Sequence, residues 1–343
     1  KNVIITGANG MVGVLSLDSW RGGSGAAWDM RVLNFGQDMA EPQRAMLDRN
    51  WFDMRMDLNY DCSLFDADGL CVAANVGYSS FGGDGVTSDS ASELQGVLMG
   101  AKRIGSSMRI GGFLDFRHYD DNLDGIDYNT PLPTFGGFIG YDQNANGTGA
   151  QARVSAAYQH GSAEFSRANL LGSALTVKAD GDFDTFGVLG ELGWGVDLGG
   201  GHVITPYLGL SYADATRQSY DENGKAGSVD DPFSYSSYSE TRTTGFVGLR
   251  AEGPLSEVVT YRLGAAVENT FSSTLDDFKF SSSLGNGSYS NGSDPADWRI
   301  DGTAGLSYLM SPNKTLTLDG LISEVQDADA PDYAISAGFK FGF

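Results

Sequence analysis

Histidine is the side chain best suited to acid–base chemistry near neutral pH, and this 343-residue chain has three, His118, His160 and His202. We predict that His118 lies on the outward side of a strand near a loop and that His202 lies in a short turn. No Ser-His-Asp set and no metal-ligand spacing surrounds any of them. The sequence therefore predicts no catalytic residue, no metal site and no enzyme.

The first residues, KNVIITGANGMVG, resemble the glycine-rich turn that binds the pyrophosphate of a dinucleotide in a Rossmann fold. That site needs a helix directly after Gly13, but the following residues alternate and then break on Gly22, Gly23 and Gly25. No alternation of strands and helices follows. We therefore expect a short hairpin with a Gly-Ala-Asn-Gly turn, and no cofactor.

Acidic residues are concentrated in stretches that we predict to be loops. The stretches contain Asp120, Asp121, Asp124 and Asp127, then Asp230 and Asp231, and then Asp276 and Asp277. The run from Asp120 to Gly125 resembles part of a calcium-binding loop, but its downstream glutamate is missing. We interpret these clusters as solvated faces; weak Ca²⁺ sites or cation bridges to lipopolysaccharide are the alternative.

Charge and cysteine content narrow the class of protein. The net charge is −22, which excludes binding to nucleic acid because that function needs patches of Lys and Arg. Cys62 and Cys71 would form a disulfide in an oxidising periplasm and would remain thiols in a cytosol. No signal peptide begins at Lys1, so we expect a mature or shortened chain.

The last residues, DYAISAGFKFGF, alternate strictly between two kinds of side chain. One face would carry Tyr333, Ile335, Ala337, Phe339, Phe341 and Phe343, and the other Ala334, Ser336, Gly338, Lys340 and Gly342. Alternation at period two predicts a strand with one apolar face. Aromatic residues crowded at the end of that face are typical of a strand that meets lipid at a membrane interface.

The same alternation recurs from Leu70 onward and predicts twelve strands in all. They lie at residues 70–79, 96–102, 108–117, 135–142, 151–159, 186–197, 204–212, 247–252, 259–268, 298–308, 316–322 and 332–343. In the second strand we expect Val97, Met99 and Ala101 to face lipid. Short connections alternate with longer ones at 81–93, 120–133, 165–182, 214–240, 272–296 and 326–331. This pattern is typical of outer-membrane barrels, with the short turns on the periplasmic side.

Charged residues of both signs are concentrated on the other side of the strands. These predicted lumen-lining residues are Arg109, Asp115, Arg117, Arg153, Glu191, Arg250, Glu252, Arg262, Glu268, Arg299, Asp301 and Lys340. A soluble β-sandwich also alternates, but aromatics repeated near strand ends favour a closed barrel with a hydrated lumen and ion pairs across it. No apolar run is long enough for a membrane-spanning helix.

One segment before the strands, residues 38–60, has helical spacing. Its apolar residues recur at i, i+4, i+7 and i+11, namely Leu47, Trp51, Met54 and Leu58. Pro42 suits a first helical turn. Residues 52–60 also alternate and could instead form an extra strand, but the twelve strands close without them, so we prefer the helix.

Together these features resemble the translocator β-domain of autotransporters, the proteins of type V secretion. The resemblance covers residues 38–343 and is carried by AKRIGSSMRIGGFLDF, DTFGVLGELGWGVDLGGGHVITPYLGLSYA, GFVGLRAEGPLSEVVTYRLGAAVE and DYAISAGFKFGF. The expected fold is all-β, a closed antiparallel 12-stranded transmembrane β-barrel with an N-terminal α-helix in the lumen. We divide the chain into a passenger remnant or linker (1–37), a pore helix (38–60), a linker clipped by a disulfide (61–69) and the barrel (70–343).

The resemblance implies a function and a set of partners. The domain would anchor as a monomer in the bacterial outer membrane and mediate export or display of an N-terminal passenger. Its partners would be outer-membrane lipid, lipopolysaccharide, the passenger segment and the barrel-assembly machinery. That machinery would read an assembly signal made of Ser336, Gly338, Phe341 and Phe343. The alternative function is a stand-alone outer-membrane porin or solute channel, which would have no plug helix.

Two further points depend on the resemblance. The DCSLFDADGLC segment departs from the family pattern, and a disulfide there would pin the linker to the first strand, at the periplasmic mouth or inside the lumen. Some family members also release the passenger by attack of a helix Asn inside the lumen. Here Asn50 or Asn59 would attack, assisted by a carboxylate from Glu191, Glu252 or Asp301, but we favour a structural role for both asparagines.

Overall fold

The computed structural model describes residues 2–6, 12–16, 25–81, 91–121, 123, 125–168, 175–224, 231–283, 285–290, 298–324 and 331–341. Phe343 and the Gly-Ala-Asn-Gly turn at 7–10 lie outside the described residues. Within these residues no helix is both long and apolar enough to span a membrane.

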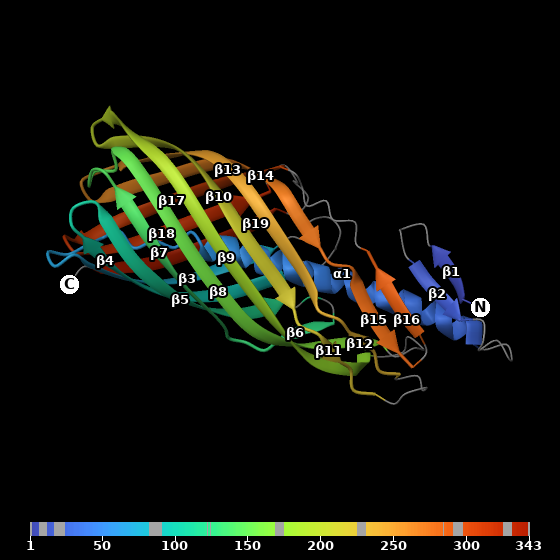
Figure 1. Cartoon of the computed structure of the whole chain (residues 1–343). Helices are drawn as coiled ribbons and strands as arrows, with labels where there is room; N and C mark the ends of the chain where they lie inside the picture. Colours follow the sequence, from blue (N-terminus) through green and yellow to red (C-terminus); the bar gives the residue numbers. More distant parts are fainter. Residues whose placement is uncertain are drawn as a thin grey trace.

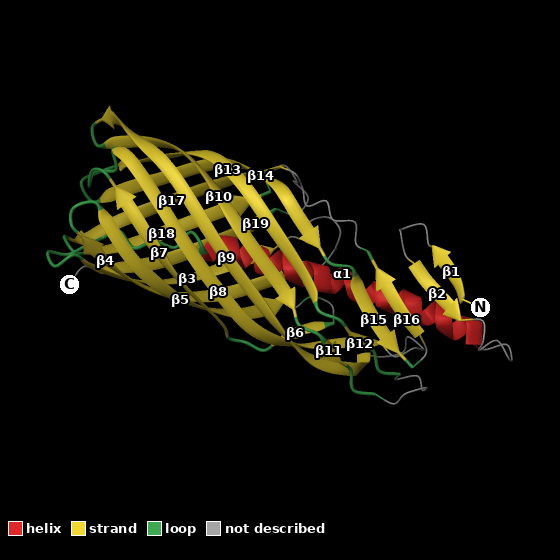
Figure 2. Cartoon of the chain, viewed as in Figure 1, coloured by secondary structure: helices red, strands yellow, loops and turns green. Residues whose placement is uncertain are grey.

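Twelve long strands form the body of the molecule (Figures 1 and 2). They are β3 (Leu70–Phe81), β4 (Ala91–Ile104), β5 (Met108–Asp121), β7 (Leu132–Asp142), β8 (Gly149–Ala168), β9 (Leu175–Gly199), β10 (His202–Arg217), β13 (Tyr238–Pro254), β14 (Val259–Leu275), β17 (Trp298–Ser311), β18 (Lys314–Ser323) and β19 (Asp332–Phe341). Neighbouring strands pair antiparallel all the way round, and pairing of β19 with β3 joins the two ends of the sheet. A closed sheet leaves no backbone edge unpaired in lipid. The predicted closed barrel is confirmed.

The outer face of the barrel is apolar, as the alternation predicts for eleven of the strands. Leu318 on β18 and Ile335 on β19 are 52% and 56% exposed, whereas Thr317, one position away, is 2% exposed. Exposed apolar side chains of this kind recur around the barrel, from Val76 on β3 to Trp298 on β17. An apolar outer band is what a strand needs where its surroundings are lipid.

The predicted orientation of β4 is wrong. Val97, Met99 and Ala101 face inward and are 1%, 5% and 7% exposed, while Leu94 and Leu98 face outward at 49% and 55%. A shift of one residue moves every side chain of a strand to the other face. Val97, Met99 and Ala101 make this part of the inner face of β4 apolar because they join a hydrophobic cluster with the helix. Gly96 and Gly100 on the outer face weakened the apolar pattern that marks the lipid side.

The predicted helix exists but is longer at its N-terminal end. Helix α1 spans Gly25–Asp57, so it begins well before the predicted residue 38 and ends just before residue 60. It is helical through Asp57, which rules out the extra strand at 52–60. Pro42 lies inside the helix rather than in its first turn. A proline there removes one backbone hydrogen bond, and the upstream residues continue the helix nonetheless.

A second, smaller sheet extends beyond one end of the barrel, around the emerging helix (Figure 1). Its strand order is β1 (Asn2–Thr6), β2 (Val12–Ser16), β16 (Gly285–Tyr289), β15 (Phe278–Ser282), β12 (Ser234–Tyr235) and β11 (Tyr220–Asp221). The pairing of β1 with β2 confirms the predicted N-terminal hairpin. A further short strand, β6 (Ile126–Tyr128), pairs with β8.

Three of the predicted long loops therefore contain strands. Strands occupy parts of 165–182, 214–240 and 272–296, because the barrel strands continue past the lipid-facing band and the second sheet follows them. The residues in these extensions bury apolar side chains against the helix instead of exposing them to lipid. These extensions have no apolar face toward lipid, so the alternation used to identify strands did not separate their inward aromatic residues from loop residues.

The seam between the first and last strands has a close steric fit. Nine residue pairs join β19 to β3, and Gly338 lies opposite Asn75. A Cβ on Gly338 would overlap Oδ1 of Asn75 and would lie 2.8 Å from Oγ1 of Thr317. The close fit at position 338 therefore requires glycine, whether or not assembly factors recognise this residue.

We expect Gly338→Ala to destabilise the folded barrel by about 1–3 kcal/mol, because the added methyl group must displace Asn75. Urea unfolding of the purified protein in detergent would measure this change. Gly320→Ala is the matched control, since the nearest atoms to its Cβ are 3.9 Å away. An equal midpoint for the two variants would contradict the steric explanation.

Candidate functional site

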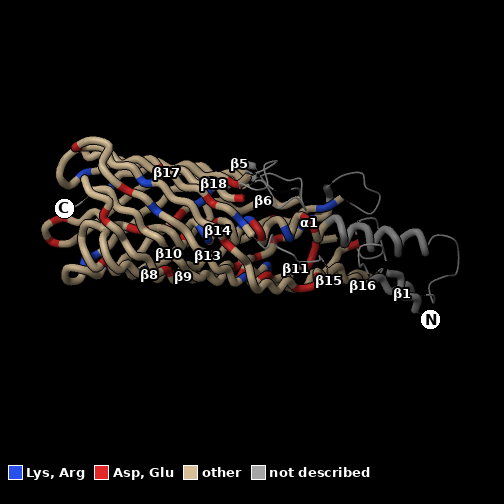
Figure 3. The backbone as a smooth tube through the Cα atoms, turned by 90° about the horizontal axis from the view of Figure 1, so that it is seen from above, with Lys and Arg blue, Asp and Glu red and all other residues tan. Residues whose placement is uncertain are grey.

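Helix α1 runs along the inside of the barrel, and its N-terminal part leaves at the end that carries the second sheet (Figure 2). Every residue from Gln43 to Met54 is buried. Figure 3 shows acidic and basic positions interspersed along the strands and the helix. A buried charge is stable only when it is paired, so the helix can stay in the lumen only if the wall supplies complementary groups.

On the side that faces β4 and β5, two carboxylates of the helix pair with the guanidinium of Arg117. Arg117 lies 2.8 Å from Asp53 and 2.5 Å from Asp57 on the helix. It also lies 2.6 Å from Glu93 on β4 and 2.9 Å from Asp115 on its own strand. All five side chains are at most 1% exposed. We call these five residues the Arg117 cluster.

Toward β13, β14 and β17, a second set of ion pairs holds the opposite side of the helix. Arg55 lies 2.5 Å from Asp301 and 2.8 Å from Glu268. Asp48, two turns further out, pairs with Arg242 of β13. The helix is therefore fixed from two sides by charged contacts that involve different turns.

Trp51 lies between these ion pairs and contacts three cations. The guanidinium carbons of Arg299, Arg55 and Arg242 are 3.9, 4.8 and 5.0 Å from its ring. The face of an indole ring attracts cations, most strongly where water is excluded. Trp51 is only 6% exposed, so it separates three like charges and stabilises each of them.

Toward β7, β8 and β9, the helix packs through apolar contacts. Met54 and Leu58 lie against Gly187, where a Cβ would be 2.6 Å from Cγ of Met54. One turn further out, Asn50 is fully buried. Its carboxamide forms no hydrogen bond with the described residues, and the same holds for the inward side chains of Thr134, Gln159 and Thr185. Polar groups of this kind are commonly bridged by internal water.

The C-terminal end of the helix is held by two residues of β8. Arg153 donates hydrogen bonds to the carbonyl oxygens of Leu58 and Tyr60, and Ser155 donates to that of Leu58 at 2.6 Å. Carbonyl groups at a helix C-terminus lack partners within the helix, and a cation there is favourable. A cavity of about 890 Å³ surrounds this end of the helix, with Arg55 and Asn59 among its lining residues.

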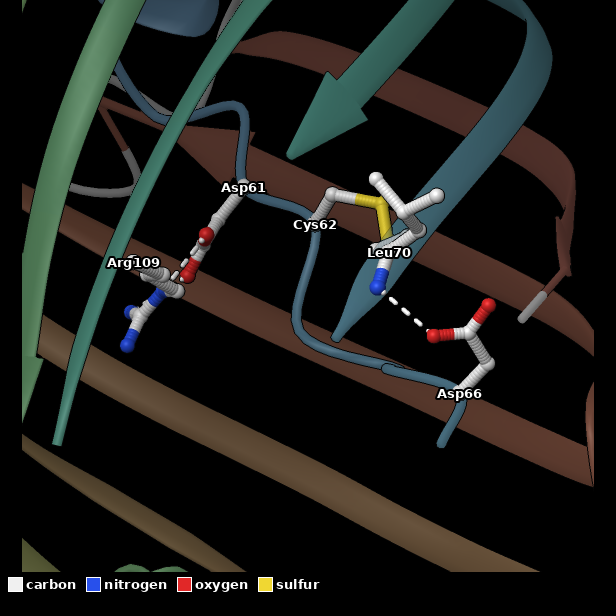
Figure 4. Close-up of a disulfide and its surroundings, with 6 residues drawn as sticks. Asp61, Cys62, Asp66, Leu70 and Arg109 are labelled. Carbon is white, nitrogen blue, oxygen red and sulfur yellow. Dashed lines mark hydrogen bonds and ion pairs between the residues drawn. A yellow bond between two sulfur atoms is a disulfide. The ribbon is translucent and has the colours of Figure 1, made fainter. Parts of the chain in front are cut away.

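The segment after the helix is tied to the barrel by the predicted disulfide, which is confirmed (Figure 4). Cys62 and Cys71 have Cα atoms 6.0 Å apart and are 0% and 1% exposed. Asp66 accepts a hydrogen bond from the backbone N–H of Leu70 at 2.7 Å. Arg109 of β5 binds Asp61 at 2.7 Å. The linker is thus held at the end of the barrel that carries the short turns.

The twelve predicted lumen-lining residues all occupy inward positions of their strands, but their surroundings differ. Arg250 pairs with Glu191, and Arg262 pairs with Asp319 at 2.6 Å. Lys340 lines the cavity, and among the described residues it forms no ion pair. Glu252 is exposed at the mouth. The helix fills the outer part of the lumen, and the cavity occupies the part toward the short turns.

The residues considered for chemistry are not brought together. Asn59 caps the helix by donating to the carbonyl oxygen of Arg55 at 2.9 Å, and no hydrogen bond of the described residues joins Asn50 to a carboxylate. His118 lies outward, as predicted, next to Thr130, and His160 contacts Asp184 on the outer surface. Within the described part of the chain, no group of His, Cys, Asp or Glu could hold a metal ion.

The charged helix residues of this site were not identified from the sequence. Arg49, Asp53 and Asp57 recur every four residues, which places them on one helical face, and this spacing was a usable signal. Glu93 was missed because residues 81–93 were predicted to be a loop, whereas β4 begins at Ala91 and places Glu93 inward with Gln95.

A closed barrel with an apolar outer band and a charged helix in its lumen is the architecture of an outer-membrane protein with a built-in plug. The family described as Autotransporter beta-domain matches residues 71–320. This chain belongs to that family, whose members are outer-membrane translocators that export or display a passenger.

A solved structure agrees with the fold. The translocator domain of NalP from Neisseria meningitidis has a TM-score of 0.63 at 15% identity, over 89% of this chain and 98% of that one. The β-domain of BrkA from Bordetella gives 0.49 at 14% identity, over 80% of this chain and 100% of that one. The transport unit of AIDA-I from Escherichia coli gives 0.45 at 11% identity, over 87% and 99%. Among curated proteins no sequence matches this chain.

We expect Arg117→Met to destabilise the protein by about 3–5 kcal/mol, because it leaves several buried carboxylates without a cation. Arg262→Met is the control: its ion pair with Asp319 is more than a third exposed, so its loss should cost less than about 1 kcal/mol. Urea unfolding followed by tryptophan fluorescence measures both. Similar losses in the two variants would show that the Arg117 cluster does not hold the helix.

Replacing both cysteines tests the linker. A crosslink that closes a loop of this length stabilises a fold by about 2–3 kcal/mol in the chain-entropy view. We therefore expect Cys62→Ser with Cys71→Ser to unfold at lower urea concentration than the oxidised parent protein. Reduction of the parent protein after unfolding should lower its refolding midpoint by the same amount. A midpoint that does not change would mean that the linker is held by Arg109 and Asp66 alone.

Proposed function

We propose that the described arrangement is the state that follows export, in which helix α1 plugs the barrel and connects it to a passenger segment outside the cell. The observation that carries this proposal is the continuous burial of the helix from Gln43 to Met54, with its N-terminal end at the face opposite the short turns. Residues 1–37 are then the passenger remnant or linker, and residues 61–69 the clipped connection to the first strand.

The mechanism requires no catalysis by this chain. Folding of the barrel and pairing of buried charges would provide the free energy that keeps the helix in place, so a passenger that has left the lumen would not return. We propose that the protein acts as a monomer, since its barrel closes on itself. Lipopolysaccharide and the barrel-assembly machinery are its proposed partners, with Ser336, Gly338, Phe341 and Phe343 as the assembly signal.

A display experiment tests the proposal. An epitope placed before Lys1 should bind antibody on intact cells, because the helix leads from the periplasmic side of the barrel to the outside. An epitope inserted at Asn144–Gly147, a short turn, should bind antibody only after the outer membrane is permeabilised. An epitope before Lys1 that stays hidden on intact cells, with a correctly folded barrel, would contradict the proposed orientation.

Conductance distinguishes this function from that of a porin. In planar bilayers the full chain should pass little current, because the helix occupies the lumen, and a chain lacking residues 1–57 should pass a large and steady current. The porin alternative predicts a large current from the full chain.

A further inference from the structure

The lumen is divided into two zones with different chemistry. At the periplasmic end, the cavity of about 890 Å³ is lined by charged groups together with polar and apolar ones, and it reaches the short turns. At the other end, the helix turn from Ala45 to Leu47 joins a hydrophobic cluster that contains no part of that cavity. The boundary between water and a dry interior therefore lies inside the barrel.

The dry zone is built from aromatic side chains of the strand extensions and the second sheet. We call this group the aromatic cap: Tyr119, Tyr128, Phe165, Phe183, Tyr220, Phe233, Tyr235, Tyr238, Phe278 and Phe280. Their rings form chains of contacts, such as Phe165–Tyr220 and Tyr220–Tyr235, each with centroids 4.7 Å apart, and Phe233–Phe280 at 5.5 Å. None of these rings is more than 6% exposed.

The cap is fastened to the barrel by a buried ion pair. Arg167, on the extension of β8, binds Glu222 through two nitrogens at 2.8 and 2.6 Å. The same carboxylate accepts hydrogen bonds from the backbone N–H of Phe233 and from the hydroxyl of Tyr235, both at 2.9 Å. Burial raises the pKa of the Tyr235 hydroxyl, so this donor keeps its proton. One bidentate pair thus ties the segment between β11 and β12 to the extension of β8.

The cap is also fastened to the helix. Arg217 donates to Oε1 of Gln43 at 2.8 Å, and Nε2 of Gln43 donates to the hydroxyl of Tyr220 at 2.8 Å. The oxygen and the nitrogen of the Gln43 carboxamide are therefore both hydrogen-bonded within the cap. Arg217 is fully buried, and its guanidinium carbon lies 4.9 Å from the centroid of the Tyr220 ring, so the cap packs closely around this contact.

From this arrangement we infer that the aromatic cap, and not the charged middle of the lumen, is the permeability barrier on the outer side of the protein. The charged contacts hold the helix, while the cap closes the remaining space around its outer turns. A layer of packed apolar side chains is an effective barrier because ions lose their hydration there without gaining partners. This inference does not depend on whether the chain exports a passenger.

Thiol labelling can locate the barrier in the full chain. A cysteine at Ala45→Cys, inside the cap, should not react with a charged, water-soluble maleimide added to intact cells. The exposed Ser290→Cys should react from outside, and Asn59→Cys only when the reagent reaches the periplasm. Phe280→Ala or Phe233→Ala, combined with Ala45→Cys, should raise the labelling rate from outside by an order of magnitude or more.

The matched control is Phe246→Ala with Ala45→Cys. Phe246 and Phe280 are both buried inward phenylalanines whose rings cover a glycine, but Phe246 borders the periplasmic cavity. It should leave the labelling of Ala45→Cys unchanged. Phe280→Leu, which removes less volume, should give an intermediate rate and serves where an alanine variant folds poorly. Labelling of Ala45→Cys from outside with an intact cap, or equal rates in the Phe246 and Phe280 variants, would overturn the inference.

Discussion

A helix that carries Arg49, Asp53, Arg55 and Asp57 can be buried only where opposite charges surround it, and this requirement organises the whole lumen. Lipid on the outside forces the strands to keep their polar side chains inward. Those inward charges would be costly in an empty dry barrel, and so would the helix charges. The charges of the helix and those of the barrel wall neutralise each other. Arg117 and Arg55 form the central ion pairs, on opposite sides of the helix.

The remaining contacts define the ends of the helix. At the end with the short turns, Arg153 binds the last carbonyl groups and the disulfide ties Cys62 to the first strand. At the outer end, Gln43 is bound within an aromatic cluster that the barrel strands build beyond the membrane band. A plug that is charged in its middle and apolar at its outer end combines firm docking with a dry seal.

Much of this architecture could be predicted from the sequence because lipid imposes a simple rule on strands. Alternation identified all twelve strands, and the N-terminal hairpin and the disulfide were also expected. The wrong predictions share one physical cause. On the inner face of the barrel, the contacts of a side chain depend on the helix, and the alternation of the strands does not show them. On β4 that contact is apolar, so Val97 and Met99 were assigned to lipid. The aromatic residues beyond the membrane were assigned to loops for the same reason.

The position of the helix in the living cell is the central claim, and one crosslink tests it directly. A Cβ at position 187 would lie 2.6 Å from Cγ of Met54, so cysteines at Met54→Cys and Gly187→Cys are close enough to form a disulfide. With the protein in its native outer membrane, mild oxidation should join the two nearly completely, visible as a mobility shift on unreduced gels. If both cysteines stay free and react with a water-soluble maleimide, the helix does not occupy the lumen.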